Sequence, residues 1–120
     1  MDSKTNIQEL KDKIKDFCDK RDWDQFHNPK DLAIGIITEA SELLELFRFK
    51  SEQEMEAMFA NQEKRVKISE ELADILYFIL RLAQKYNIDL TTEVHNKMAK
   101  NEKKYPIEKA KGSNKKYNEL

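Results

Sequence analysis

The chain contains very few of the residues that break helices or form disulfides. Its 120 residues include two glycines, two prolines and one cysteine. The single cysteine, Cys18, excludes an intramolecular disulfide and a zinc site built on cysteines. The scarcity of glycine and proline, together with abundant Glu, Lys and Leu, favours an all-α fold. No apolar run reaches the roughly 18 residues that a membrane-spanning helix needs, so we expect no membrane partner.

The chain also lacks an excess of charge of either sign. There are 22 Lys and Arg against 23 Asp and Glu, which gives a net charge of −1. The net charge is therefore too small to attract a charged partner, and we expect no nucleic-acid partner. The lysine-rich C-terminal segment could bind nucleic acid, but Tyr117 is its only aromatic residue. The first residues are polar and charged rather than those of a signal peptide, so we expect a cytoplasmic location.

The spacing of apolar residues predicts four long helices. Their expected ranges are about 5–22, 29–49, 62–86 and 89–104. Asn28 and Asp89 are favourable N-caps for the second and fourth helices. Asn87 is a plausible left-handed cap after the third helix, and Pro106 stops the fourth. Residues 51–61 indicate either a short capped helix or an irregular loop.

We therefore predict one four-helix-bundle-type domain over residues 1–106, followed by a mobile lysine-rich tail over residues 107–120. The second predicted helix is apolar on more than one side. These apolar residues are Leu32, Ile34, Ile36, Ile37, Leu43, Leu44, Leu46 and Phe47. A domain of this size can hardly surround such a helix alone, so we expect a homo-oligomer, either a dimer or a tetramer.

Two acidic pairs lie inside the most apolar stretches of the chain. Glu39 and Glu42 form one pair, and Glu71 and Asp74 form the other, each with a spacing that places both carboxylates on one helix face. Such carboxylates need a compensating charge, and an oxygen-only site suits Mg²⁺ or Mn²⁺. A solvated surface is the alternative, because acidic pairs arise often by chance among 23 acidic residues. A di-iron site is disfavoured because neither pair follows the Glu-x-x-His pattern.

Aromatic and basic residues extend these helix faces. At about 100° per residue, Phe78 falls within about 40° of Glu71 and Asp74, and Phe49 falls within about 20° of Glu42. On the fourth helix, an edge predicted from the same angles carries two cations, an amide and an adjacent aromatic ring. These residues are Lys97, Asn101, Lys104 and Tyr105. An ordinary solvated face is the alternative for this edge.

These motifs together resemble the MazG-like all-α nucleotide pyrophosphohydrolases, and most closely their dCTP pyrophosphatase branch. The resemblance covers about residues 7–106. It rests on the two acidic pairs in order and on the segments around them. These segments are residues 21–32, residues 42–50 and residues 97–106.

The resemblance implies hydrolysis of a nucleoside triphosphate to the monophosphate and pyrophosphate. It implies Mg²⁺ held by four carboxylates, which are those of Glu39, Glu42, Glu71 and Asp74. It also implies a substrate site with an aromatic base pocket and cations near the phosphates. The candidate substrate-binding residues are Trp23, His27, Phe49, Tyr77, Phe78, Lys97, Asn101, Lys104 and Tyr105.

Three positions depart from the dCTP pyrophosphatase pattern and leave the preferred base open. Position 49 is Phe where that branch usually has Trp, position 78 is Phe where it has Tyr, and position 14 is Ile where it has His. Tyr77 is an alternative source of the hydroxyl that position 78 lacks. Glu45, one turn after Glu42, is our candidate for orienting or deprotonating the attacking water. The alternative to an enzyme is a catalytically silent helical module for oligomerisation.

Overall fold

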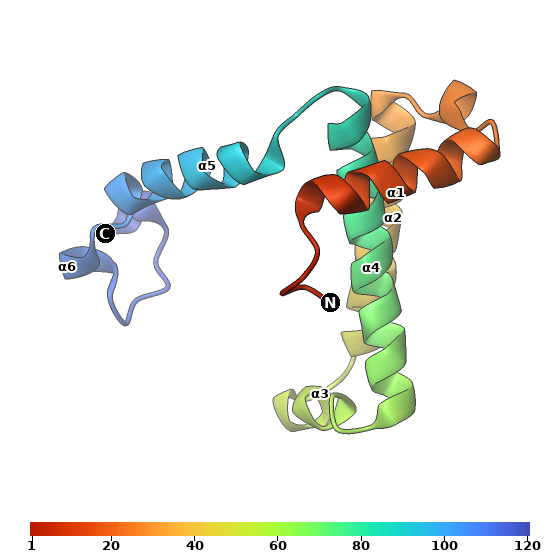
Figure 1. The fold of residues 1–120 in the computed structure, drawn as a ribbon. Coiled ribbons are helices and arrows are strands. Elements are labelled where there is room, and N and C mark those ends of the chain that lie inside the picture. The colour runs from red at the N-terminus through yellow and green to blue at the C-terminus, as the bar shows by residue number, and fades with distance from the viewer. The chain divides into compact units, whose positions relative to one another are not determined.

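The computed structural model describes residues 1–120 and consists of helices and connecting turns (Figure 1). The elements are α1 (Ile7–Lys20), the 3-10 turn η1 (Asp24–Phe26), α2 (Pro29–Phe47), α3 (Glu52–Met58), α4 (Gln62–Lys85), α5 (Leu90–Lys104), α6 (Ile107–Ala110) and the 3-10 turn η2 (Tyr117–Glu119). The predicted all-α class is confirmed, and the four long helices begin and end within two residues of their expected bounds. None of the helices has the length and apolar character required to cross a bilayer.

Local capping explains where the helices start. The Asn28 Oδ1 atom accepts a hydrogen bond of 2.9 Å from the backbone N–H of Asp31, at the start of α2. The Asp89 side chain accepts one of 2.9 Å from Thr92 at the start of α5, so both predicted N-caps are confirmed. A capping box made by Ser51 forms α3, which decides between the helix and the loop expected there.

The expected end of the second helix needs a correction. We expected this helix to reach Phe49, but α2 ends at Phe47 and Phe49 has a left-handed φ of 62°. The chain has to leave the helix here because Ser51 starts α3. Phe49 therefore does not extend the helical face of Glu42, and the angle that placed it there does not apply.

The chain divides into two compact units, residues 1–87 and residues 88–120. Asn87, the last residue of the first unit, has the left-handed φ of 56° expected of a residue that follows a helix. The domain boundary predicted after residue 106 stays a prediction. Helix α5 contributes no buried residue, whereas α1, α2 and α4 share the core of the first unit. The mobility expected of residues 107–120 stays a prediction, and α6 and η2 lie in that range.

Within the first unit, α2 and α4 pack side by side and α1 packs against α4 (Figure 1). The buried apolar core of this unit is small. It consists of Cys18, Leu32, Met58, Ile68, Leu80 and Ala83. Many larger apolar side chains on α2 and α4 remain exposed, including Ile37, Leu44 and Leu72. The core thus covers only one side of each of these two helices.

Candidate functional site

Three of the predicted carboxylates gather between α2 and α4. Oxygen atoms of Glu39, Glu42 and Glu71 all lie within 4.8 Å of one another, because the two helices that carry them pack side by side. The Oε2 atoms of Glu39 and Glu71 are buried and have no hydrogen-bond partner. Leaving a buried acceptor unpaired costs about 1–3 kcal/mol, and more when the group is charged. The three carboxylates therefore lie where their oxygen atoms could ligate one cation.

The raised pKa values of the clustered carboxyl groups also fit a cation site. Burial raises the pKa of Glu39 to about 7, and the neighbouring carboxyl groups of Glu71 and Glu42 add to this effect. Burial is also the largest cause that raises the pKa of Glu71. Like charges that share a site disfavour ionisation of all members, and a bound cation relieves the repulsion. Simultaneous ionisation of the three carboxyl groups is therefore unfavourable when no cation is bound.

Asp74, the fourth predicted ligand, lies beside this group rather than within it. It follows Glu71 by one helical turn on α4 and is exposed. Its negative charge contributes to the raised pKa values of both Glu39 and Glu71, so it lies close enough to act on them. The structure brings together three of the four carboxylates and places the fourth one turn away.

A ring packed against a helix backbone lies next to the carboxylates. A Cβ atom added at Gly35 would stand 2.6 Å from the Phe78 ring, so the ring lies against the α2 backbone at this glycine. Gly35 precedes Glu39 by one turn, and Phe78 follows Asp74 by about one turn. Phe78 was predicted to lie on the same face of its helix as Asp74. Its ring also contacts α2. Gly35 was not predicted from the sequence, where its only signal was a glycine inside an apolar helix.

A second aromatic group links α1 to α4. The Phe17 ring meets Trp23 edge-on with centroids 5.6 Å apart, and it meets Tyr77 edge-on at 6.3 Å. The Tyr77 hydroxyl lies 3.2 Å from the Sγ atom of Cys18, and burial raises the pKa of Tyr77. Tyr77 was the alternative source of the hydroxyl that position 78 lacks. Its hydroxyl is held at the contact between α1 and α4.

A buried arginine that was not predicted from the sequence joins α4 to the segment before α2. The Arg81 side chain is 1% exposed. It donates to Nδ1 of His27 at 2.9 Å, to Oδ1 of Asp24 at 2.9 Å and to Oε1 of Gln84 at 2.6 Å. The Lys85 Nζ atom donates to the backbone carbonyls of Asp24 and His27. The only sequence signal was an arginine placed among apolar residues near the end of α4.

The remaining predicted residues of the first unit are exposed. Glu45 forms an ion pair of 3.5 Å with Arg48 and lies outside the cluster of three carboxylates. Phe49 is 88% exposed, and the Arg48 guanidinium lies 4.6 Å from the centroid of its ring. The roles predicted for Glu45 and Phe49 stay predictions.

The other four predicted residues lie in the second unit. Lys97, Asn101 and Lys104 are on α5, and Tyr105 follows as its C-cap. Lys104 Nζ lies 4.8 Å from the Tyr117 ring centroid, and Tyr105 meets the same ring edge-on at 6.2 Å. These contacts are internal to the second unit. The expected contribution of these residues to a site with the carboxylates stays a prediction.

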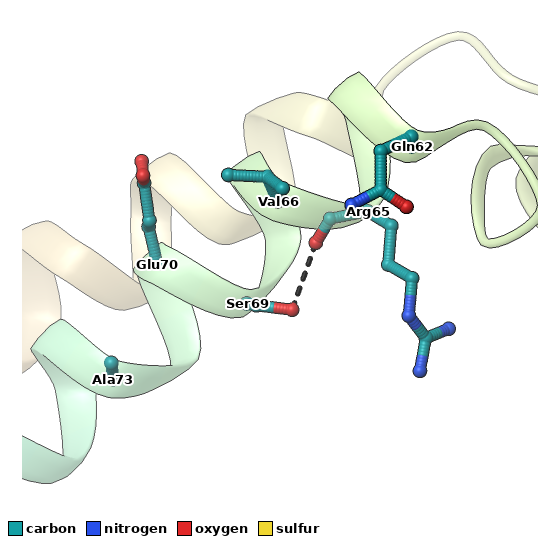
Figure 2. A pocket seen from close by; sticks show the side chains of 6 residues that line it. All are labelled: Gln62, Arg65, Val66, Ser69, Glu70 and Ala73. Carbon is teal, nitrogen blue, oxygen red and sulfur yellow. Dashed lines mark hydrogen bonds between the residues drawn. The ribbon is translucent and has the colours of Figure 1, made fainter.

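A pocket of about 370 Å³ lies along the first three turns of α4 (Figure 2). Its lining residues are Gln62, Arg65, Val66, Ser69, Glu70 and Ala73. They all belong to α4, and the Ser69 hydroxyl donates back to the Arg65 carbonyl at 2.8 Å. None of the predicted site residues lines this pocket, so it is separate from the carboxylate cluster.

Comparison with known proteins gives the family. The model of the MazG-like family matches residues 34–120, a range that contains both acidic pairs and more than half of the chain. The chain belongs to the MazG-like family. The predicted resemblance to this family is therefore confirmed, and the carboxylate cluster lies within the matched residues.

Curated relatives of this MazG-like chain carry one name. The proteins named dCTP pyrophosphatase 1 from Rattus norvegicus and Homo sapiens are each 37% identical to it over 105 residues, which are 88% of this chain and 62% of theirs. The Bos taurus protein of the same name is 34% identical over 118 residues, 98% of this chain and 70% of its own length. The chain thus spans between three fifths and about two thirds of the length of these relatives.

A solved structure shares the fold of this MazG-like chain. A crystal structure described as a pyrophosphatase from Archaeoglobus fulgidus is 38% identical to it, with a TM-score of 0.77. The match covers 82% of this chain and 91% of the archaeal one. At this level of identity the likeness supports both the all-α fold and membership of the family.

Proposed function

We propose that the chain is a Mg²⁺-dependent nucleoside triphosphate pyrophosphohydrolase. The reaction would convert an NTP or dNTP and water into the monophosphate and pyrophosphate. The observation that carries this proposal is the cluster of Glu39, Glu42 and Glu71, in which two buried oxygens have no partner. The names of the rat, human and bovine relatives support a nucleotide as the substrate.

The donor set of the cluster fits a hard cation. Glu39, Glu42 and Glu71, with Asp74 beside them, would hold Mg²⁺, and Mn²⁺ is a possible substitute because it also accepts oxygen ligands. Bound there, the cation would supply Lewis-acid polarisation of a phosphate oxygen and a lowered pKa for a water molecule. The carboxylates alone would repel a triphosphate, so their own contribution is to create a site that requires the cation.

Other side chains would position the substrate. Phe78 offers an apolar ring beside the carboxylates, which suits a sugar or a base rather than a phosphate. Lys97 and Lys104 would neutralise charge on the triphosphate, a task for which their ammonium groups act as point charges. Glu45, one turn beyond Glu42, would orient or deprotonate the attacking water.

The proposed substrate is a dNTP such as dCTP, or a modified nucleotide removed from the pool in the cytoplasm. The name of the curated relatives supports dCTP. Phe78 has no hydroxyl, and the hydroxyl of Tyr77 already contacts Cys18. Both observations support weaker selection for a particular base or sugar at these positions. A panel of canonical and modified NTPs and dNTPs with Mg²⁺, read out as pyrophosphate, would rank the substrates.

Removal of single carboxyl charges tests the reaction. Glu42→Gln and Asp74→Asn should each lower the rate of pyrophosphate release by about 100-fold or more, because metal charge stabilisation is worth several kcal/mol. Glu70→Gln is the matched control, since Glu70 precedes Glu71 on α4 and lies outside the cluster. Near wild-type turnover in either Glu42→Gln or Asp74→Asn would refute the metal assignment.

A catalytically silent module for oligomerisation is the second candidate. The exposed apolar side chains on α2 and α4, among them Leu44 at 70%, favour self-association. A chain that associates but releases no pyrophosphate from any nucleotide in the panel would support this function. Self-association also fits an active enzyme, so pyrophosphate release is the measurement that separates the two candidates.

A further inference from the structure

The segment that carries Trp23 is held in place by polar contacts from α4. No residue of η1 is buried, so apolar packing does little to fix it. Arg81 bonds to Asp24 and His27 at the two ends of the turn, and Lys85 adds bonds to the backbone carbonyls of the same two residues. Because the guanidinium is buried and charged, removing its partners would be costly. The two cations therefore hold η1 against the last turns of α4.

The same contact sets the proton on His27. A guanidinium stays protonated, so its Nε atom donates and Nδ1 of His27 must accept at 2.9 Å. Burial, then the charges of Arg81 and Lys85, lower the pKa of His27 below its usual 6.5, and Asp24 opposes them. The ring is therefore neutral at neutral pH and carries its proton on Nε2. His27 thus presents a fixed donor at the nitrogen opposite Arg81.

This donor lies beside Trp23. The Trp23 and His27 rings meet edge-on with centroids 6.4 Å apart. Trp23 is partly exposed and rests on Phe17, so one part of its surface remains accessible to a ligand. A flat group in contact with the indole would lie within reach of the imidazole. A nucleobase is such a group, and it carries carbonyl oxygens or unprotonated ring nitrogens that accept hydrogen bonds.

We propose that Arg81 is a positioning residue that holds the Trp23–His27 segment and presents Nε2–H of His27 to an acceptor atom of the nucleobase. The identity of the ligand as a nucleotide rests on the proposed function. The role of Arg81 differs from that of the carboxylates, because it acts through His27 and Trp23. Arg81 lies seven residues beyond Asp74 on α4, about two turns away, so this positioning residue and the acidic pair of α4 lie on different parts of the same helix.

A spectroscopic experiment tests the geometry without any activity. The chain has two histidines, so ¹⁵N-labelled imidazoles give two sets of signals, and His95→Asn assigns them. At pH 7.5 the wild type should show His27 as the Nε2–H tautomer. Arg81→Gln should convert this signal to a mixture of tautomers, while Arg65→Gln, which removes another arginine of α4, should leave it unchanged. An Nδ1–H tautomer in the wild type would overturn the proposal.

A kinetic experiment tests the contact with the base. In His27→Asn the amide oxygen can take the place of Nδ1 as acceptor for Arg81, but the Nε2 donor is lost. We expect KM for the preferred nucleotide to rise about tenfold with kcat unchanged, the effect of one lost hydrogen bond. The base-free substrate 2-deoxyribose 5-triphosphate should show the same kcat/KM with the variant as with the wild type. His95→Asn is the matched control and should alter neither substrate.

The outcomes separate this inference from the proposed function. If the wild type hydrolyses nucleotides but His27→Asn leaves KM unchanged, the inference fails and the proposed function stands. If kcat/KM falls equally for the nucleotide and for the base-free triphosphate, the role of His27 is structural and the inference also fails. If the wild type hydrolyses no triphosphate, the proposed function fails and takes the nucleobase contact with it. The tautomer experiment would then still decide whether Arg81 fixes the proton of His27.

Discussion

At the scale of single residues, Gly35 shows how one absent methyl group shapes the space beside the carboxylates. Gly35→Ala would place a Cβ atom 2.6 Å from the Phe78 ring. Alanine is favoured over glycine inside a helix by about 1 kcal/mol, but overpacking costs about 1–3 kcal/mol, so we expect net destabilisation. Urea denaturation measures the change, and adding Phe78→Leu to Gly35→Ala should recover most of it. An alanine variant more stable than the wild type would contradict the contact.

The second residue-scale prediction concerns the pH dependence of stability. The pKa of His27 is lowered in the folded protein by burial and by Arg81 and Lys85, against the opposing charge of Asp24. As the pH falls below the ordinary pKa of 6.5, His27 therefore becomes protonated in the unfolded chain before it does in the folded protein. The stability that the neutral ring provides is present above pH 6.5 and is lost as pH falls through the folded-state pKa.

Thermal unfolding between pH 7.5 and pH 5 measures this effect. Relative to His27→Asn, whose amide does not titrate, the wild type should lose stability toward the acid end of the range. The raised pKa of Glu39 opposes this loss in both proteins, so the difference between their profiles is the measurement. Equal pH profiles for the two proteins would rule out His27 as the source of the loss.

At the scale of elements, the N-cap of α2 can be tested by itself. Asn28 accepts from the backbone of Asp31 and also donates to its carboxylate at 2.7 Å. Asn28→Ala should lower the free energy of unfolding by about 1 kcal/mol, while Asn28→Ser should recover most of this loss because its hydroxyl can accept the same bond. Chemical denaturation of the three proteins gives the comparison. No difference between alanine and serine would show that capping at Asn28 adds nothing.

Most of the elements could be predicted because their signals are local. Asn28 and Asp89 act on backbone N–H groups three residues away, and these groups are fixed by the sequence alone. Phe49 was misplaced because a helix end is decided by competition with the next element, here the capping box at Ser51. The periodic pattern carries no information about that competition.

The candidate site was predicted only in part. The acidic residues were recognisable because each pair lies in an apolar helix, and Glu39, Glu42 and Glu71 do gather. Arg81 was missed because arginine is normally exposed, and only its partners on another segment explain its burial. Gly35 was missed for a related reason, since its value depends on which ring of α4 faces it.

At the scale of the whole molecule, the exposed apolar side chains of α2 and α4 predict self-association. Ile37, Leu44 and Leu72 would remain in contact with water in a single copy. We expect sedimentation to show a dimer or a tetramer, and Ile37→Glu and Leu44→Glu to shift the chain toward monomer, because a buried unpaired charge is unfavourable. Gln53→Glu adds the same charge on α3 and should change nothing. A monomeric wild type would contradict the prediction.

Trp23 is the only tryptophan of the chain, and it lies in the segment that Arg81 and Lys85 hold. Intrinsic fluorescence excited at the indole band therefore reports one place in the molecule, with no second emitter to subtract. The proposed base contact thus has an optical probe built into the chain, so ligand binding at this segment can be followed in unlabelled protein.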